Sequence, residues 1–151
     1  MAIGYDWKNP MSIWNKKFTL LDLEERNKGT MIEYLDIQIT EIGENFLRGD
    51  MPVDDRTKQP AEIMHGGASL VLAETLGSTA ANMTVDESRY QCVGMEINAN
   101  HIRSVREGRV SGIAKPHHLG RSTQVWEILI YDREERLVCV SRLSISVLKQ
   151  F

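Results

Sequence analysis

One carboxylate stands alone in a segment of the chain that is otherwise apolar or small. Glu74 lies within residues 59–81, QPAEIMHGGASLVLAETLGSTAA, and no Lys or Arg stands three or four residues away to form a helical ion pair. A helix that is apolar on all sides is normally buried, and a buried carboxylate is costly unless it is paired or hydrogen-bonded. We therefore expect Glu74 to be functional. The alternative is a structural hydrogen bond inside a dimer interface.

The start of the same helix carries a second chemical feature. His65, Gly66 and Gly67 place little side chain at the end where backbone N–H groups are unpaired and the helix dipole is positive. Such an end can polarise a carbonyl group. Alternatively, the two glycines only allow a tight turn against neighbouring backbone.

The spacing of these two features constrains how they can cooperate. Gly66 and Glu74 are eight residues apart, which corresponds to roughly 12 Å along one helix. One carbonyl cannot contact both, because catalytic contacts need about 3 Å. If both act on the same carbonyl, they must come from two subunits related by a two-fold axis. This predicts an obligatory homodimer with two equivalent sites.

Hydrophobic periodicity predicts the elements that position these groups. Residues near 19–29 have a cap at Thr19 and a stop at Gly29, which indicates a short outer helix. Alternating apolar residues indicate strands, and turn residues separate them. The expected order is two strands, one long helix and four strands: 35–40, 47–53, helix 66–83, 90–102, 109–117, 121–132 and 136–148. This order predicts an α+β fold in which an antiparallel sheet wraps around one central helix.

Length and composition limit the class of protein. A chain of 151 residues fits one domain, and a net charge of −3 argues against a general nucleic-acid binder. Cys92 and Cys139 lack metal-ligand spacing, which favours packed thiols in a reducing compartment and no metal. No run approaches the roughly 18 apolar residues of a membrane span. We expect a cytoplasmic single domain over residues 1–151, with 1–11 as an N-terminal extension.

Five segments together resemble the hotdog-fold acyl-CoA thioesterases of the type that hydrolyses 4-hydroxybenzoyl-CoA. They are MPVDDRTKQP (51–60), HGGASLVLAETLGS (65–78), VGMEINANHIRSVREGRV (93–110), KPHHLGR (115–121) and VWEILIYD (125–132). The chain is most similar to the 1,4-dihydroxy-2-naphthoyl-CoA thioesterases of menaquinone biosynthesis and to the enterobactin proofreading thioesterases. The resemblance implies a hotdog fold, hydrolysis of aromatic acyl-CoA thioesters and a homotetramer built from dimers.

The same resemblance implies roles for individual residues. Glu74 would be the nucleophile or general base, and the Gly66 N–H would polarise the thioester carbonyl. His65 and Gln59 would hold the thioester end, while Ser78 would orient the Glu74 carboxylate or the attacking water. Two mechanisms stay open: attack by Glu74 to give a mixed anhydride, or activation of water by Glu74. For His65, the alternative is a polar residue that only caps the helix.

Basic residues near two turns would bind the phosphates of coenzyme A, since arginine suits phosphate by its planar fork of donors. The resemblance favours four of them: His101, Arg103, His118 and Arg121. The others near these turns are Arg106, Arg109 and Lys115. The alternative for the whole set is ordinary solvated charges at sheet edges and turns, which we expect for at least half of them. No cofactor is expected, because coenzyme A is part of the substrate.

Ala61 and Glu62 depart from the resembled family, in which an aromatic residue and a glycine follow Gln59-Pro60. This change leaves the acyl group open, because an aromatic side chain there could stack on an aryl substrate. A carrier-protein thioester is an alternative substrate. Hydration or dehydration of acyl-CoA is a second alternative, although relatives of that kind use an Asp/His pair, and a non-catalytic dimer that binds acyl-CoA is a third.

Overall fold

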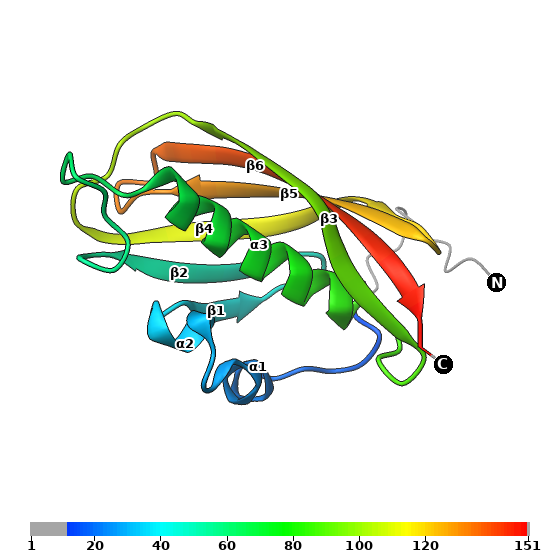
Figure 1. Cartoon of the computed structure of the whole chain (residues 1–151). Helices are drawn as coiled ribbons and strands as arrows, with labels where there is room; N and C mark the ends of the chain where they lie inside the picture. Colours follow the sequence, from blue (N-terminus) through cyan, green and yellow to red (C-terminus); the bar gives the residue numbers. More distant parts are fainter. Residues whose placement is uncertain (1–11, 151) are drawn as a thin grey trace.

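Six antiparallel strands form one sheet in the computed structural model, which describes residues 12–150 (Figure 1). The strand order across the sheet is β1-β2-β4-β5-β6-β3. The strands are β1 (Gln38–Ile42), β2 (Leu47–Val53), β3 (Tyr90–His101), β4 (Gly108–Leu119), β5 (Thr123–Tyr131) and β6 (Leu137–Lys149). All neighbouring pairs are antiparallel, so the predicted class of sheet is confirmed.

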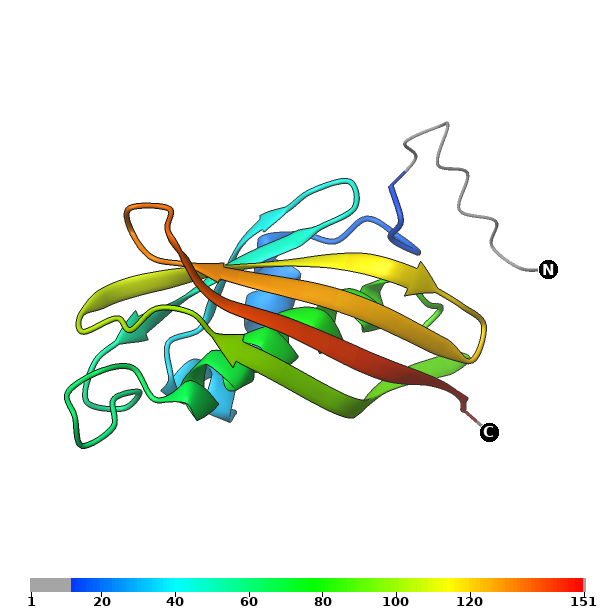
Figure 2. The same ribbon diagram turned by 90° about the horizontal axis from the view of Figure 1, so that it is seen from above.

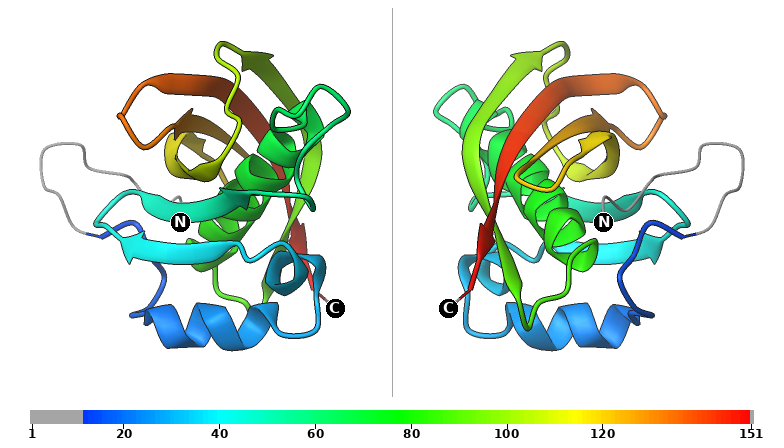
Figure 3. Two further views of the ribbon diagram at one scale, coloured as in Figure 1. Left: turned by 90° about the vertical axis from the view of Figure 1, so that its left-hand side faces the viewer. Right: turned by 90° about the vertical axis from the view of Figure 1, so that its right-hand side faces the viewer.

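One long helix, α3 (Gly66–Met83), lies along the concave side of this sheet. The end-on views in Figure 3 show the strands curving around it, and Figure 2 shows β4, β5 and β6 crossing it. Leu72 and Leu76 on α3 have no exposed surface, and neither does Trp126 on β5. Burial of such apolar side chains is the dominant favourable contribution to folding. The predicted helix over residues 66–83 is confirmed.

Two short helices precede the sheet. α1 (Leu20–Asn27) begins at Thr19, whose side chain and that of Asp22 form a reciprocal capping box, as the cap residue predicted. Leu23 is 1% exposed and anchors α1 on the core. α2 (Met31–Tyr34) was not predicted, because four residues are too few to show a helical period.

A buried chain of hydrogen bonds ties the end of α3 to β5. The Trp126 indole Nε1 donates to Gln124 Oε1 at 2.9 Å, and Gln124 Nε2 donates to Thr84 Oγ1 at 2.9 Å. Thr84 Oγ1 in turn donates to the Ala81 carbonyl at 2.8 Å. Because buried polar groups are costly when unpaired, this chain of hydrogen bonds stabilises the position of the helix end against β5.

The expected N-terminal extension, residues 1–11, lies outside the described residues. Within residues 12–150, no helix has the length and apolar character needed to cross a membrane. Cellular location and the extent of the domain stay predictions.

Cys92 and Cys139 are both buried free thiols. Burial raises the pKa of Cys92 to about 11 and also raises the pKa of Cys139. Only the thiolate is nucleophilic, so at pH 8 iodoacetamide should label neither cysteine in the native protein. Mass spectrometry should show two additions after labelling in denaturant. Rapid labelling of the native protein would contradict the burial of these thiols.

Candidate active site

Glu74 is half-buried on α3 and is held by one side chain of its own helix. Ser78, one turn further along, donates its hydroxyl to Glu74 Oε1 at 2.7 Å. None of the ion pairs within residues 12–150 involves Glu74. The predicted proximity of Ser78 to the carboxylate is therefore present, and it leaves Oε2 available for chemistry.

Gly94 on β3 forms the other wall around this carboxylate, and the sequence prediction missed it. A methyl group added at Gly94 would lie 2.6 Å from Glu74 Oε1, so only glycine fits without moving the carboxylate. The pairing of β3 with β6 also shifts between Gly94 and Glu96, which marks a bulge beside the site. Bulges are frequent next to active sites. A glycine inside the apolar strand pattern VGMEI was the available sign.

The start of α3 keeps an unused donor. His65 is the N-cap, and its Nδ1 accepts from the Gly67 N–H at 2.8 Å. None of the hydrogen bonds within residues 12–150 uses the Gly66 N–H. Since the helix dipole is positive at this end, the Gly66 N–H is a free donor suited to a carbonyl oxygen or an anion.

His101, predicted to contact coenzyme A, lies directly against this helix start. A methyl group at Gly66 would be 2.8 Å from His101 Nε2. His101 is the last residue of β3, and its side chain is exposed. The imidazole therefore borders the thioester end of the predicted site. If His101 contacts a phosphate of coenzyme A, that phosphate must lie close to the helix start.

Gln59 and the two departing residues form the turn just before α3. The Gln59 Oε1 accepts from the Ala61 N–H at 2.9 Å, and the Gln59 N–H donates to the Ile63 carbonyl at 3.0 Å. Glu62 has a φ of 62°, in the left-handed region that favours glycine. This turn is exposed at Ala61 and Glu62, so both side chains lie at the rim of the helix start.

The four basic residues assigned to coenzyme A lie at opposite ends of the sheet. His101 pairs with Cys139 on β6, and Arg103 follows it. His118 and Arg121 flank the β4–β5 turn, where Thr123 pairs with Ser146 at the other end of β6. Seven residues of strand correspond to about 24 Å. One chain therefore cannot bring both pairs to the same phosphate group.

Two other basic residues are used within the fold. Arg109 Nη1 donates to Asp36 Oδ2 at 2.7 Å, and this hydrogen bond lowers the pKa of Asp36. Lys115 Nζ lies 5.8 Å from the centre of the Phe46 ring. Both side chains therefore have partners within the fold, and whether they also contact coenzyme A stays a prediction.

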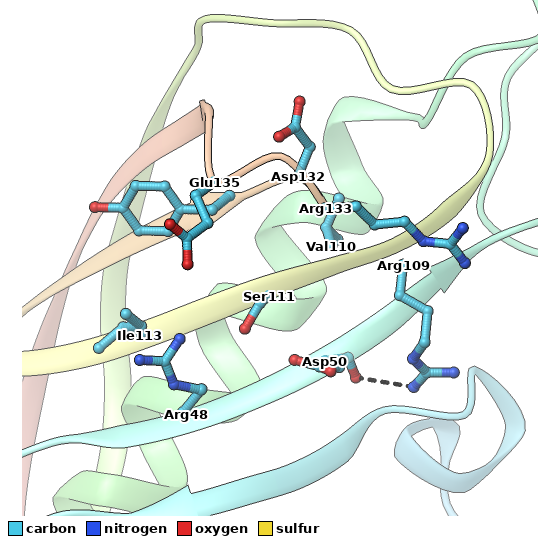
Figure 4. Close-up of a pocket in the computed structure, with 10 residues that line it drawn as sticks. Arg48, Asp50, Arg109, Val110, Ser111, Ile113, Asp132, Arg133 and Glu135 are labelled. Atoms are coloured by element: carbon cyan, nitrogen blue, oxygen red, sulfur yellow. Dashed lines mark hydrogen bonds between the residues drawn. The ribbon is translucent and has the colours of Figure 1, made fainter.

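A groove of about 630 Å³ lies on the convex face of the sheet, away from α3 (Figure 4). Three arginines and three carboxylates line it: Arg48, Arg109, Arg133, Asp50, Asp132 and Glu135. None of the predicted catalytic or coenzyme A residues lines this groove. The predicted site is instead divided along α3, with one part at the helix start and the carboxylate about two turns later, near the middle of the helix.

Sequence comparison identifies the family of this chain. Residues 61–139 match the sequence pattern of the Thioesterase superfamily, which covers more than half of the chain. The chain belongs to the Thioesterase superfamily. It is 52% identical over 136 residues to 1,4-dihydroxy-2-naphthoyl-CoA hydrolase of Escherichia coli, an alignment that covers 90% of this chain and 99% of the relative.

Two further proteins similar to this chain are thioesterases, and one of them has a crystal structure. A proofreading thioesterase of Cronobacter sakazakii is 50% identical over 137 residues, covering 90% of this chain and 98% of the relative. The crystal structure of a mutant thioesterase from Pseudomonas aeruginosa aligns with a TM-score of 0.91 at 42% identity, covering 92% of this chain and all of that one. The predicted hotdog fold and thioester hydrolase activity are thereby confirmed. The roles of individual residues stay predictions.

The fit of Gly94 against Glu74 gives a test of the site in this thioesterase. Gly94→Ala should displace the carboxylate and lower kcat for thioester hydrolysis by about ten- to hundredfold, because small misplacements of catalytic groups are costly. Gly29→Ala is the control, since Gly29 has a φ of 72° with open space around it. That change should reduce the free energy of unfolding but leave kcat unaltered. Full activity in Gly94→Ala would show that Gly94 does not confine the carboxylate.

Proposed function

We propose that this thioesterase hydrolyses acyl-CoA thioesters with aromatic acyl groups, using Glu74 of one subunit and the Gly66 N–H of another. The observation that carries this proposal is the Glu74 carboxylate, held by Ser78 at 2.7 Å and confined by Gly94. It is a half-buried carboxylate with one oxygen free, which is the arrangement a nucleophile or a general base requires.

Glu74 can act in two ways from this position. As a nucleophile, its free oxygen bonds to the thioester carbon, the C–S bond breaks and coenzyme A leaves as the thiolate. Water then hydrolyses the mixed anhydride and restores the carboxylate. As a general base, Glu74 takes a proton from water, whose oxygen attacks the carbon, and that proton passes to the departing sulfur. Ser78 orients the carboxylate in both routes.

The start of α3 supplies the second half of the chemistry. The Gly66 N–H has no acceptor within residues 12–150, and it points outward from the positive end of the helix. A thioester carbonyl oxygen placed there gains negative charge during attack, so a preorganised donor stabilises the transition state more than the substrate. His65 and Gln59 border this position, and the His65 Nε2 is not used by its capping bond.

Two subunits are needed because Gly66 and Glu74 both lie on α3, about 12 Å apart. β3 supports a two-fold assembly: it is a twelve-residue edge strand, and Val93 and Met95 on it are 42% and 56% exposed. An edge strand presents unpaired backbone N–H and C=O groups on which another chain can pair. A dimer through β3 would cover the region beside Glu74, and the family resemblance favours a dimer of such dimers. The same pairing would let His101 and Arg103 of one subunit bind one coenzyme A together with His118 and Arg121 of the other.

The relatives support an aromatic acyl group. The Escherichia coli relative is named for 1,4-dihydroxy-2-naphthoyl-CoA, and at 52% identity it favours an aryl-CoA substrate and a role in menaquinone biosynthesis. Ala61 and Glu62 lie on the exposed turn before the helix start, where they would border the acyl group.

Thiol release from a panel of naphthoyl-, benzoyl-, phenylacetyl- and fatty acyl-CoA thioesters tests this function. The wild type should prefer aryl-CoA, and Glu74→Gln should lower kcat by about three orders of magnitude or more, the scale of an essential nucleophile or base. Glu44→Gln, the same change at an exposed turn residue, should leave kcat unaltered.

Three outcomes would contradict the proposal. Equal rates for wild type and Glu74→Gln would remove Glu74 from the mechanism. Faster turnover of aryl thioesters on a carrier protein than of the matched coenzyme A thioesters would assign the substrate to the carrier. A preference for fatty acyl-CoA would remove the aromatic group.

A further inference from the structure

Glu74 and Ser78 are two members of a polar row on α3, and Asn82 is the third. The three residues are spaced by four positions, so they lie on one face of the helix. All three are half-buried, and this face is directed toward β3. Asn82 was not among the predicted site residues, and nothing in the proposed chemistry uses it.

Asn82 joins helix and strand through its whole amide group. Its Oδ1 accepts from the Cys92 N–H at 2.9 Å, and its Nδ2 donates to the Cys92 carbonyl at 3.2 Å. The same Nδ2 donates to the Ser78 carbonyl at 3.0 Å. Both amide hydrogens are thereby used. The side chain pairs with Cys92 as a neighbouring strand would, on the edge of β3 that no other strand within residues 12–150 occupies.

This contact lies next to the carboxylate along both elements. Gly94 is two residues beyond Cys92, about 7 Å along the strand, and its Cα faces Glu74. The bulge between Gly94 and Glu96 interrupts the pairing of β3 with β6 at this point, so the sheet holds the strand less firmly there. Close to Gly94, the hydrogen bonds between Asn82 and Cys92 therefore connect β3 to α3.

We propose that Asn82 is a positioning residue for thioester hydrolysis. By holding β3 against α3 at Cys92, it keeps the Gly94 backbone close to Glu74 and confines the carboxylate to the orientation that Ser78 selects. The inference rests on the proposed role of Glu74. Loss of Asn82 should affect the chemical step, because its bonds go to the Ser78 carbonyl and the Cys92 backbone and its amide is fully used by them.

The test compares Asn82→Ala and Asn82→Asp with a control variant that loses a different hydrogen bond between α3 and the sheet. Thr84→Val breaks the hydrogen bond from Gln124 that fixes the same end of α3 to β5, and it leaves the bonds between Asn82 and Cys92 in place. Kinetics are measured with the thioester that the wild type hydrolyses fastest, well below the melting temperature of each variant. Light scattering checks that each variant has the oligomeric state of the wild type.

Asn82→Ala should lower kcat by about ten- to hundredfold with KM changed less than about twofold, because a small shift of the carboxylate slows the chemical step. Asn82→Asp keeps an acceptor for the Cys92 N–H and should recover part of kcat. Thr84→Val should lose stability and keep kcat. Because Asn82 and Gly94 act on the same distance, the loss in the double variant Asn82→Ala, Gly94→Ala should be less than the product of the single losses.

An unchanged kcat in Asn82→Ala, with stability lost as in Thr84→Val, would overturn the role of Asn82 and leave a structural bond. Dissociation into monomers that accounts for the lost activity would also overturn it. If Asn82→Ala does not fold, Asn82→Asp decides the question by the same kcat and KM comparison. Wild-type turnover in Glu74→Gln would instead overturn the proposed function and this inference with it.

Discussion

The Glu74 carboxylate has no cation beside it. The helix and the strand around it must therefore supply both its hydrogen bonds and the space that it occupies. A half-buried carboxylate on an apolar helix needs hydrogen bonds in place of bulk water. Ser78 supplies one, and the missing side chain of Gly94 makes room for the group. Besides forming the core, three features therefore set the position of this one carboxylate: the antiparallel sheet, the bulge in β3 and the length of α3.

The length of α3 has a further consequence for assembly. The helix carries a free donor at its start and the carboxylate two turns later, so both are rigidly placed but cannot meet within one chain. The four basic residues assigned to coenzyme A are also divided into two groups, since they lie at the two ends of the sheet. An exposed edge strand lies beside the carboxylate, and pairing through it would bring complementary halves together. In the proposed dimer, the assembly and the chemistry would depend on the same strand.

Much of this arrangement could be predicted from the sequence because it depends on local patterns. The apolar segment with one Glu gave α3 and the carboxylate, Thr19 gave the start of α1, and two-residue alternation gave most of the strands. The first strand was placed too early, because Leu35 is the C-cap of α2 and β1 begins only at Gln38. Ser78 was predicted from the family resemblance, and its place one helical turn from Glu74 agrees with the contact in the structure.

The residues that were missed act through contacts between distant segments. Gly94 matters only because β3 lies against α3, and Asn82 only because its amide meets Cys92 ten residues later. Neither contact has a periodic pattern. His101 was assigned to phosphate by its charge, whereas its position depends on where β3 ends relative to Gly66.

Mixing two inactive variants tests most directly whether the two halves of the site come from different subunits. Glu74→Gln loses the carboxylate half, and a variant inactivated at the helix start, Gln59→Ala combined with His65→Ala, loses the other. Random reassembly gives half heterodimers, each with one intact site, so we predict recovery of about a quarter of wild-type activity. No recovery, with heterodimers verified by mass spectrometry, would contradict the shared site.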